Sequence, residues 1–174
     1  MALEVKLLHR NARKPTKGNP EDVGWDLYLP KTMTLEAHGR NGPDTGIGVA
    51  ILTPPGWGAL IRPRSSATSR GIHVAGTIDR YTGELHLVLW NLTNKEIACP
   101  AGSRVAQFIP FWSGAGGQQH IVDAFMDMDV EQSVGMNLGT VLLKNLTACD
   151  GIRVVEEFTN PPKRGDGGFG STGA

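Results

Sequence analysis

The sequence has few cysteines, few aromatic residues and no excess of charge of either sign. Of its 174 residues, two are cysteines and 6% are aromatic, while 17 lysines and arginines balance 17 aspartates and glutamates. Two cysteines cannot build a disulfide framework or a four-cysteine zinc site. A net charge of zero provides no general attraction to a nucleic-acid backbone or to an anionic membrane. We therefore expect no nucleic acid and no membrane among the partners.

Long apolar runs are also missing. No stretch approaches the roughly 18 apolar residues that a membrane-spanning helix requires. The opening residues, MALEVKLLHRNARK, lack the apolar core of a secretory signal peptide. At roughly 150 residues per domain, the length predicts a single domain over residues 1–174. These features favour a cytoplasmic protein, which would act in the host cytoplasm if the chain is viral.

Glycine and proline, in contrast, occur throughout the chain, with 23 and 11 copies. Between them lie short runs in which apolar and polar residues alternate, which is typical of strands separated by turns. The pattern predicts an all-β fold, a barrel or a jelly roll. The predicted strands cover residues 3–7, 27–29, 33–35, 47–51, 85–90, 105–111 and 152–158. No helical period is found before residue 118.

Residues 114–150 differ from the rest of the chain in composition. They carry five acidic residues against one lysine and three of the five methionines. Val122, Met126 and Val130 recur at helical spacing, which predicts an amphipathic helix over 120–131. We expect a partly helical insert in the β-scaffold that docks on another protein or on a neighbouring subunit. A solvated helix face explains its acidic residues more simply than a metal site does.

Two segments place polar groups beside predicted strands. Arg62-Pro63-Arg64-Ser65-Ser66 offers guanidinium and hydroxyl donors to an anion, unless it is only a surface turn with salt bridges. In Gly102-Ser103-Arg104-Val105-Ala106-Gln107, strand alternation would place Arg104 and Gln107 on opposite faces, so that at most one points inward.

The segment Gly76-Thr77-Ile78-Asp79-Arg80-Tyr81-Thr82-Gly83-Glu84 has turn glycines on both sides of a carboxylate and an aromatic ring. This pattern predicts a hairpin, whose free backbone edge could present N–H and C=O groups to a base. The alternative is a plain hairpin in which Asp79 accepts a hydrogen bond from a nearby N–H group.

The last segment, residues 159–174, is rich in glycine and proline and has little to bury, so we expect a flexible tail. It contains G-x-G-x-x-G, but no strand precedes the motif and no helix follows it, which excludes a dinucleotide-binding fold. Its arginine, hydroxyls, backbone N–H groups and single ring instead suit a phosphate clamp with a ring that covers a base.

Taken in order, these segments resemble the five motifs of the trimeric dUTP pyrophosphatase (dUTPase) family. Asp22-Val23-Gly24-Trp25-Asp26-Leu27 is similar to the first motif, A-G-x-D-L, with Asp22 where alanine is usual. Residues 63–66, 76–84, 104–107 and 164–173 are similar to the second to fifth. The resemblance covers nearly the whole chain. It departs where only Arg80 separates Asp79 from Tyr81, since the family usually has two residues there.

The resemblance implies a distorted jelly-roll barrel that forms a homotrimer with active sites shared between subunits. It implies hydrolysis of dUTP to dUMP and pyrophosphate by in-line attack of water on the α-phosphorus, which limits uracil incorporation into DNA and supplies dUMP. Asp79 would be the general base. Mg2+ would be held mainly by phosphates and waters, with Asp26 as a partner through water.

The resemblance also implies roles for the residues that bind substrate. Uracil would lie against the hairpin backbone, Tyr81 against the deoxyribose and Phe169 over the base. The expected substrate-binding residues are Arg64, Ser65, Ser66, Gly76, Thr77, Ile78, Tyr81, Gln107, Arg164, Phe169, Gly170, Ser171 and Thr172.

Two other functions agree with parts of this pattern. The related dCTP deaminases share the fold and an R-S-S motif, but they require a glutamate where this chain has Val88 and an arginine where it has Ser69. The second alternative is a regulatory protein that keeps the dUTPase fold and acts through residues 114–150.

Overall fold

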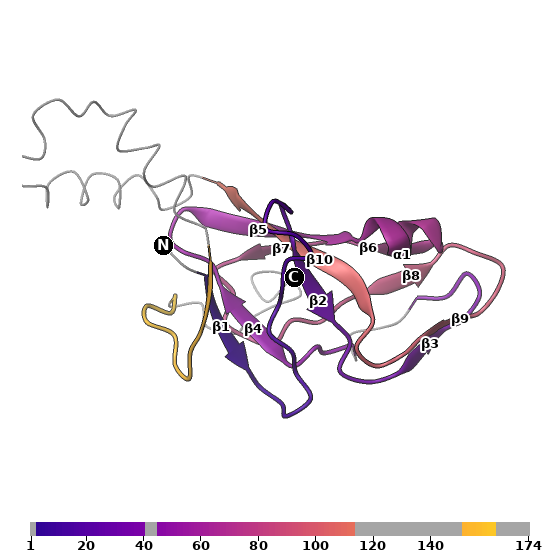
Figure 1. Ribbon diagram of the computed structural model, residues 1–174, viewed down its shortest axis with the longest axis horizontal. Coiled ribbons are helices and arrows are strands. Elements are labelled where there is room, and N and C mark those ends of the chain that lie inside the picture. Colours follow the sequence, from indigo (N-terminus) through magenta and orange to yellow (C-terminus); the bar gives the residue numbers. More distant parts are fainter. Residues whose placement is uncertain (1–2, 41–44, 114–150, 163–174) are drawn as a thin grey trace, which may run out of the picture.

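A computed structural model of the chain describes residues 3–40, 45–113 and 151–162, and within these ranges the fold is built of short β-strands (Figure 1). The strands are β1 (Leu3–Leu7), β2 (Trp25–Tyr28), β3 (Met33–Leu35), β4 (Val49–Leu52), β5 (Trp57–Pro63), β6 (Ile72–Val74), β7 (Gly76–Asp79), β8 (Leu89–Asn91), β9 (Ile97–Cys99), β10 (Arg104–Trp112) and β11 (Ile152–Val154). The all-β prediction is confirmed. The insert at 114–150, with its predicted helix, lies outside the described residues.

One helix, α1 (Ser65–Ser69), corrects the expectation that no helix precedes residue 118. Its sequence, SSATS, has no apolar period, and only Ala67 is buried. Hydroxyls within the helix hydrogen-bond to carbonyls one turn back, Thr68 to Arg64 and Ser69 to Ser65. Five small residues that follow a strand give no helical signal in a sequence, since such residues favour turns and caps. No helix in the described part of the chain is long and apolar enough to cross a membrane.

The strands form four sheets. The largest contains β2, β10, β5 and β7 in that spatial order, all antiparallel. A second sheet has the order β11-β1-β4, in which β1 and β11 are parallel and pair Leu3 with Ile152. The pairs β3–β9 and β6–β8 complete the fold. In Figure 1, α1 lies beside β6 and β8.

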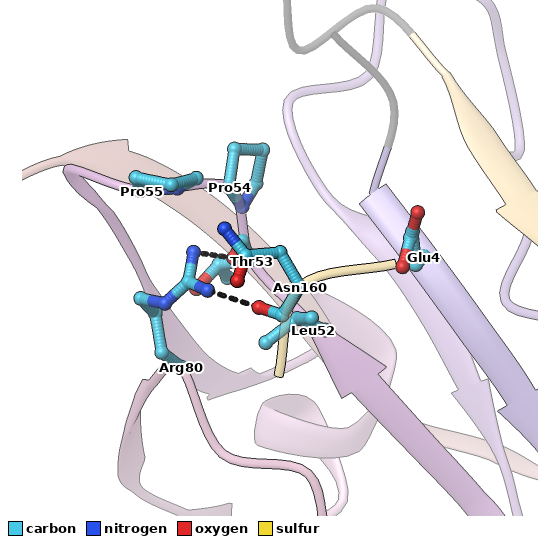
Figure 2. A pocket seen from close by; sticks show the side chains of 7 residues that line it. All are labelled: Glu4, Leu52, Thr53, Pro54, Pro55, Arg80 and Asn160. Atoms are coloured by element: carbon cyan, nitrogen blue, oxygen red, sulfur yellow. Dashed lines mark hydrogen bonds between the residues drawn. The ribbon is translucent and has the colours of Figure 1, made fainter. Parts of the chain in front are cut away.

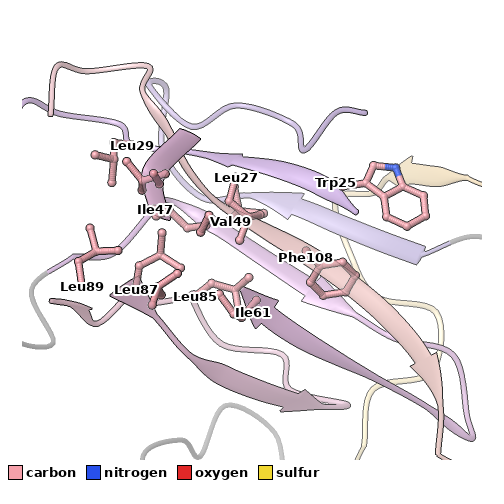
Figure 3. Packing of buried hydrophobic residues seen from close by; sticks show 14 of the residues in the cluster. Trp25, Leu27, Leu29, Ile47, Val49, Ile61, Leu85, Leu87, Leu89 and Phe108 are labelled. Atoms are coloured by element: carbon pink, nitrogen blue, oxygen red, sulfur yellow. The ribbon is translucent and has the colours of Figure 1, made fainter. Parts of the chain in front are cut away.

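The core is formed by apolar side chains from β2, β4, β5, β10 and the 85–89 segment (Figure 3). Phe108, Leu27 and Leu87 are almost completely buried. Burying each such side chain contributes about 1.5–3 kcal/mol to stability. The predicted alternation over 85–90 is confirmed in burial, because Leu85, Leu87 and Leu89 are buried and the residues between them are less so.

Two predicted strands are shorter in the structure than the sequence pattern suggests. Only the end of 85–90 belongs to a strand, β8, and only the start of 152–158 does, β11. In the first case the backbone of 85–87 bonds to residues 45–49 without forming a long ladder. In the second, the backbone N–H of Val155 still donates to the carbonyl of Val5 on β1, and further along the segment Thr159 is held by the side chain of Glu4.

Candidate active site

The first four sequence motifs occupy four neighbouring strands of one sheet. Its spatial order, β2-β10-β5-β7, places the first motif on β2, the fourth on β10, the second at the end of β5 and the third on β7. Segments up to about 80 residues apart in the sequence therefore become neighbours through the pairing of strands. Figure 1 shows β10 running between β2 and β5.

The carboxylate of Asp26 joins three of these motifs. Its Oδ1 forms an ion pair with Arg64 Nε at 2.6 Å, and its Oδ2 accepts a hydrogen bond from Arg104 Nη1 at 3.0 Å. The Asp26 side chain is only 7% exposed. A buried carboxylate requires such partners, since an unpaired charge in this position would be costly. Asp26 thus fixes two arginines at the edge of the sheet.

A β-bulge places Arg104 and Gln107 on the same side of the sheet. Arg104 lies opposite Tyr28 and Gln107 lies opposite Asp26. These partners are two positions apart on β2, whereas Arg104 and Gln107 are three positions apart on β10. The register shift occurs between Arg104 and Ala106. The prediction that these two side chains point to opposite faces was wrong, because it assumed an uninterrupted strand. The bulge adds one residue to β10 and thereby reverses the alternation.

Gln107 lies against the second motif. Its Nε2 donates to the carbonyl of Pro63 at 3.1 Å. On the other side, a Cβ added to Gly24 would lie 2.5 Å from Gln107 Oε1, so a larger residue at this position of the first motif would displace the Gln107 carboxamide. The bond to Pro63 holds the carboxamide beside the segment that contains Arg64, Ser65 and Ser66.

Ser65 and Ser66 begin α1, directly after Arg64, and both are exposed. The backbone of Arg64 is extended, and its N–H donates to the carbonyl of Val105. This bond ties the start of the helix to β10. The structure therefore brings Asp26, Arg64, Ser65, Ser66 and Gln107 together, with Arg104 as an additional member that sequence analysis left without a role. We call these six residues the anion cluster.

The third motif lies in an open hairpin. Its stem is the β6–β8 pair, in which Ile72 faces Asn91 and Val74 faces Leu89. Beyond the stem the two arms separate: β7 pairs with β5, and residues 85–87 bond to residues 45–49. No strand pairing between the two arms is found among the described residues. The predicted hairpin is thus formed at its stem only, and its arms are held apart by different neighbours.

Asp79 and the anion cluster lie at opposite ends of β5. Asp79 pairs with Gly58, near the start of that strand, while Arg64 follows its end. Gly58 and Arg64 are six positions apart in extended chain, which corresponds to about 20 Å. Gly76, at the other end of β7, pairs with Ile61. A single chain therefore does not bring Asp79 to the anion cluster.

The remaining expected residues fall into two groups. Thr77 is exposed, Ile78 is buried, and Tyr81 is half-buried against the hydrophobic core. The five tail residues, Arg164, Phe169, Gly170, Ser171 and Thr172, lie outside the described residues. Among residues 3–40, 45–113 and 151–162, no three His, Cys, Asp or Glu side chains gather as they would to ligate a metal.

Comparisons with known proteins agree with this arrangement. A family model described as dUTPase matches residues 10–133. The chain is 33% identical over 174 residues to the deoxyuridine 5'-triphosphate nucleotidohydrolase of Saccharomyces cerevisiae, which covers 98% of this chain and 94% of the yeast protein. It is equally similar, at 33% over 175 residues, to the protein of that name from Paramecium bursaria Chlorella virus 1, covering 99% and 98% of the two chains.

Solved structures share the fold. A mutant dUTPase from phage phi11 of S. aureus, described with a structural Mg(II) ion, superposes with a TM-score of 0.59 at 23% identity, over 63% of this chain and 90% of the phage chain. The match of the family model to most of the chain, and the full-length identity to the yeast and viral proteins, agree with the five motifs. The chain therefore belongs to the dUTPase family.

Proposed function

We propose that this chain is a dUTP diphosphatase, which hydrolyses dUTP to dUMP and pyrophosphate. The observation that carries the proposal is the placement of four motifs on four adjacent strands of one sheet. The names of the yeast and viral relatives support the same activity. They do not favour a deaminase or a purely regulatory protein. The activity would limit uracil incorporation into DNA and supply dUMP.

The anion cluster would bind the phosphate chain. Arg64 and Arg104 are fixed by Asp26, so that their positions are set before substrate arrives. Ser65 and Ser66 add exposed hydroxyl donors, and the carboxamide of Gln107 lies beside them. Charge-assisted donors held in advance stabilise negative charge that develops on phosphate oxygens during attack.

The open hairpin would bind the base. In one arm β7 pairs with β5, and in the other arm residues 85–87 bond to residues 45–49, so that the edges of the two arms do not pair with each other among the described residues. Backbone N–H and C=O groups on such edges match the acceptor and donor positions of uracil. The ring of Tyr81 would lie against the deoxyribose and reject a 2′-hydroxyl.

Asp79 would be the general base for the water that attacks the α-phosphorus. Its carboxylate would accept the proton that the water loses as it attacks. The α-phosphorus forms a bond to the oxygen of water, and its bond to the bridging oxygen breaks, so that pyrophosphate leaves. Residues Arg164, Phe169, Gly170, Ser171 and Thr172 of the fifth motif would complete the site around the γ-phosphate and the base.

The metal would be Mg2+. The described residues offer no cluster of three carboxylate or imidazole ligands, which fits an ion held mainly by the triphosphate and its waters. Asp26, whose oxygens already form ion pairs with two arginines, would contact the hydrated ion through water. When bound, Mg2+ supplies positive charge that neutralises the phosphates.

The assembly would be a homotrimer with shared sites. Asp79 and the anion cluster are separated by about 20 Å along β5, and a general base must act within hydrogen-bond reach of its water. This separation supports a site in which one subunit provides Asp79 and another provides Arg64. We further propose that residues 1–174 form one cytoplasmic domain and that residues 114–150 contact a protein partner or a neighbouring subunit.

A panel of nucleoside triphosphates with product analysis tests the function. We expect dUTP with Mg2+ to give dUMP and pyrophosphate, and UTP, dTTP and dCTP to react far more slowly. Formation of dUTP from dCTP would indicate a deaminase, and equal rates on dUTP and UTP would contradict the role given to Tyr81.

A further inference from the structure

The turn after Asp79 is shorter than in the family pattern, and a single residue, Arg80, forms it. The φ angle of Arg80 is 44°, in the left-handed region that side chains other than glycine rarely adopt. Among the described residues, His38 is the one other non-glycine residue with positive φ. Such a conformation costs energy, so it persists where surrounding contacts hold it in place.

The guanidinium group of Arg80 provides those contacts. Its Nη1 donates to the carbonyl of Thr53 at 3.3 Å, and its Nη2 donates to the carbonyl of Asn160 at 2.5 Å. Figure 2 shows the side chain reaching between these two residues. Thr53 follows β4 and is completely buried, while Asn160 belongs to the segment after β11. One side chain therefore connects three segments that are distant in sequence.

The segment that receives this contact is anchored a second time, one residue earlier. The backbone N–H of Thr159 donates to Glu4 Oε2 at 2.8 Å, and Arg153 donates to the other oxygen of Glu4. A cavity of about 80 Å3 lies between the Glu4 contacts and Arg80, lined also by Leu52, Pro54 and Pro55. Arg80 lines this cavity together with Thr53 and Asn160, the two residues whose carbonyls it contacts.

From this geometry we infer that Arg80 is a positioning residue for the reaction, an inference that rests on the proposed function of Asp79. Pairing with Gly58 fixes the backbone of Asp79 on one side. Arg80 fixes the chain on the other side, and the same guanidinium holds residues 159–162 next to it, directly before the fifth motif.

Two substitutions separate the side chain from the backbone conformation. Arg80→Met and Arg80→Gly both remove the guanidinium, but glycine adopts a positive φ without strain. Because small misplacements far from the chemistry slow catalysis strongly, we expect both variants to lose about 10- to 100-fold in kcat for dUTP, with KM changed by less than about threefold. Amide hydrogen exchange in peptides spanning 156–162 should become faster in both variants.

Two controls complete the experiment. Arg10→Met removes an exposed arginine that takes no part in the contacts of Thr53, Glu4 or Asn160, and it should change neither kcat nor exchange. Arg80→Lys keeps a cation that can reach one carbonyl, and it should recover part of both readouts. Thermal unfolding of each variant verifies that the fold is retained.

Three outcomes would overturn the inference. Normal kcat in Arg80→Gly would mean that the backbone turn alone is sufficient. Slow catalysis without faster exchange at 156–162 would mean that Arg80 does not clamp that segment. Full activity of Asp79→Asn, measured in parallel, would reject Asp79 as the base and with it the role of Arg80 in catalysis. Hydrogen exchange at 156–162 does not depend on the role of Asp79, so it would still report whether Arg80 holds that segment.

Discussion

Asp79 is the residue on which the proposed chemistry depends most. Substitution Asp79→Asn keeps the shape of the side chain but removes its capacity to accept a proton. We expect kcat to fall by roughly 10²–10⁴, the usual scale for loss of a positioned base, while KM for dUTP changes little. Steady-state kinetics on the purified variant measures both values. Turnover close to that of the parent chain would show that the base lies elsewhere.

Asp26 is the residue whose loss should affect both stability and binding. In Asp26→Asn, the two arginines lose their shared carboxylate, and Arg64 is only 26% exposed. Because breaking a buried ion pair leaves a charge without its partner, we expect the free energy of unfolding to fall by about 3 kcal/mol. Urea unfolding measures this change, and KM for dUTP should rise in the same variant.

Glu21→Gln is the matched control for Asp26→Asn, since Glu21 is exposed and lies in the same region of the chain. It should unfold at the same urea concentration as the parent chain. Equal stability of all three proteins would mean that Asp26 does not support the arginines in solution.

At the scale of secondary-structure elements, the segment after β11 depends on one carboxylate. Burial of Glu4 tends to raise its pKa, but hydrogen bonds from the hydroxyl and N–H of Thr159 and from Arg153 outweigh this effect, and the pKa is lowered. The resulting stabilisation is fully present above the ordinary pKa of 4.5. It is lost as the pH falls through the lower value of the folded state.

Glu4→Gln should therefore be less stable than the parent chain at neutral pH, by about 1–3 kcal/mol, because a charge-assisted hydrogen bond is lost. Below the ordinary pKa of glutamate, the difference should become smaller. Unfolding curves at pH 7 and at acid pH measure the difference. A gap that is independent of pH would mean that shape, and not charge, explains the effect.

The contribution of the fifth motif, residues 164–173, to catalysis can be tested by truncation. Ending the chain after Lys163 removes Arg164, Phe169 and the two hydroxyl residues, but it leaves every described strand in place. We expect nearly all turnover to be lost, since these groups would hold the γ-phosphate and exclude water. The melting temperature should stay unchanged. A truncated protein with full activity would show that the motif has no part in catalysis.

Sequence analysis predicted the elements better than their contacts. Alternating apolar residues were enough to predict the all-β fold and most strands, because burial repeats with a period of two. Three local features gave no such signal: the helix α1, the bulge between Arg104 and Ala106, and the left-handed backbone of Arg80. Each depends on neighbours distant in the sequence, as does the pairing of Asp26 with two arginines. The roles of Asp79 and of the tail stay predictions.

For the whole molecule, the separation of Asp79 from the anion cluster leads to a test by subunit mixing. Ser66→Glu places a carboxylate where phosphate would bind, at an exposed position in the first turn of α1, where a negative charge is tolerated. Alone, this variant and Asp79→Asn should each be inactive. In mixed trimers, a site that takes Asp79 from one variant and Ser66 from the other is intact.

Random mixing of equal amounts makes roughly one quarter of such shared sites complete. We therefore expect coexpressed variants to recover about that fraction of the parent activity, and sedimentation should give the mass of a trimer. If the mixture stays inactive, although it forms trimers, then the base and the phosphate-binding groups act within one chain.

The parallel pairing of β1 with β11 also has a consequence for synthesis of the protein. Leu3 and Ile152 lie 149 residues apart, so the first strand cannot find this neighbour until almost the whole chain has left the ribosome. Until then, one edge of β1 lacks its final partner and can pair with a strand of another nascent chain. Such distant contacts also slow refolding, to the millisecond-to-second range typical of β-proteins. Chains that terminate early would therefore be prone to aggregate even when every motif up to Gln107 has been translated.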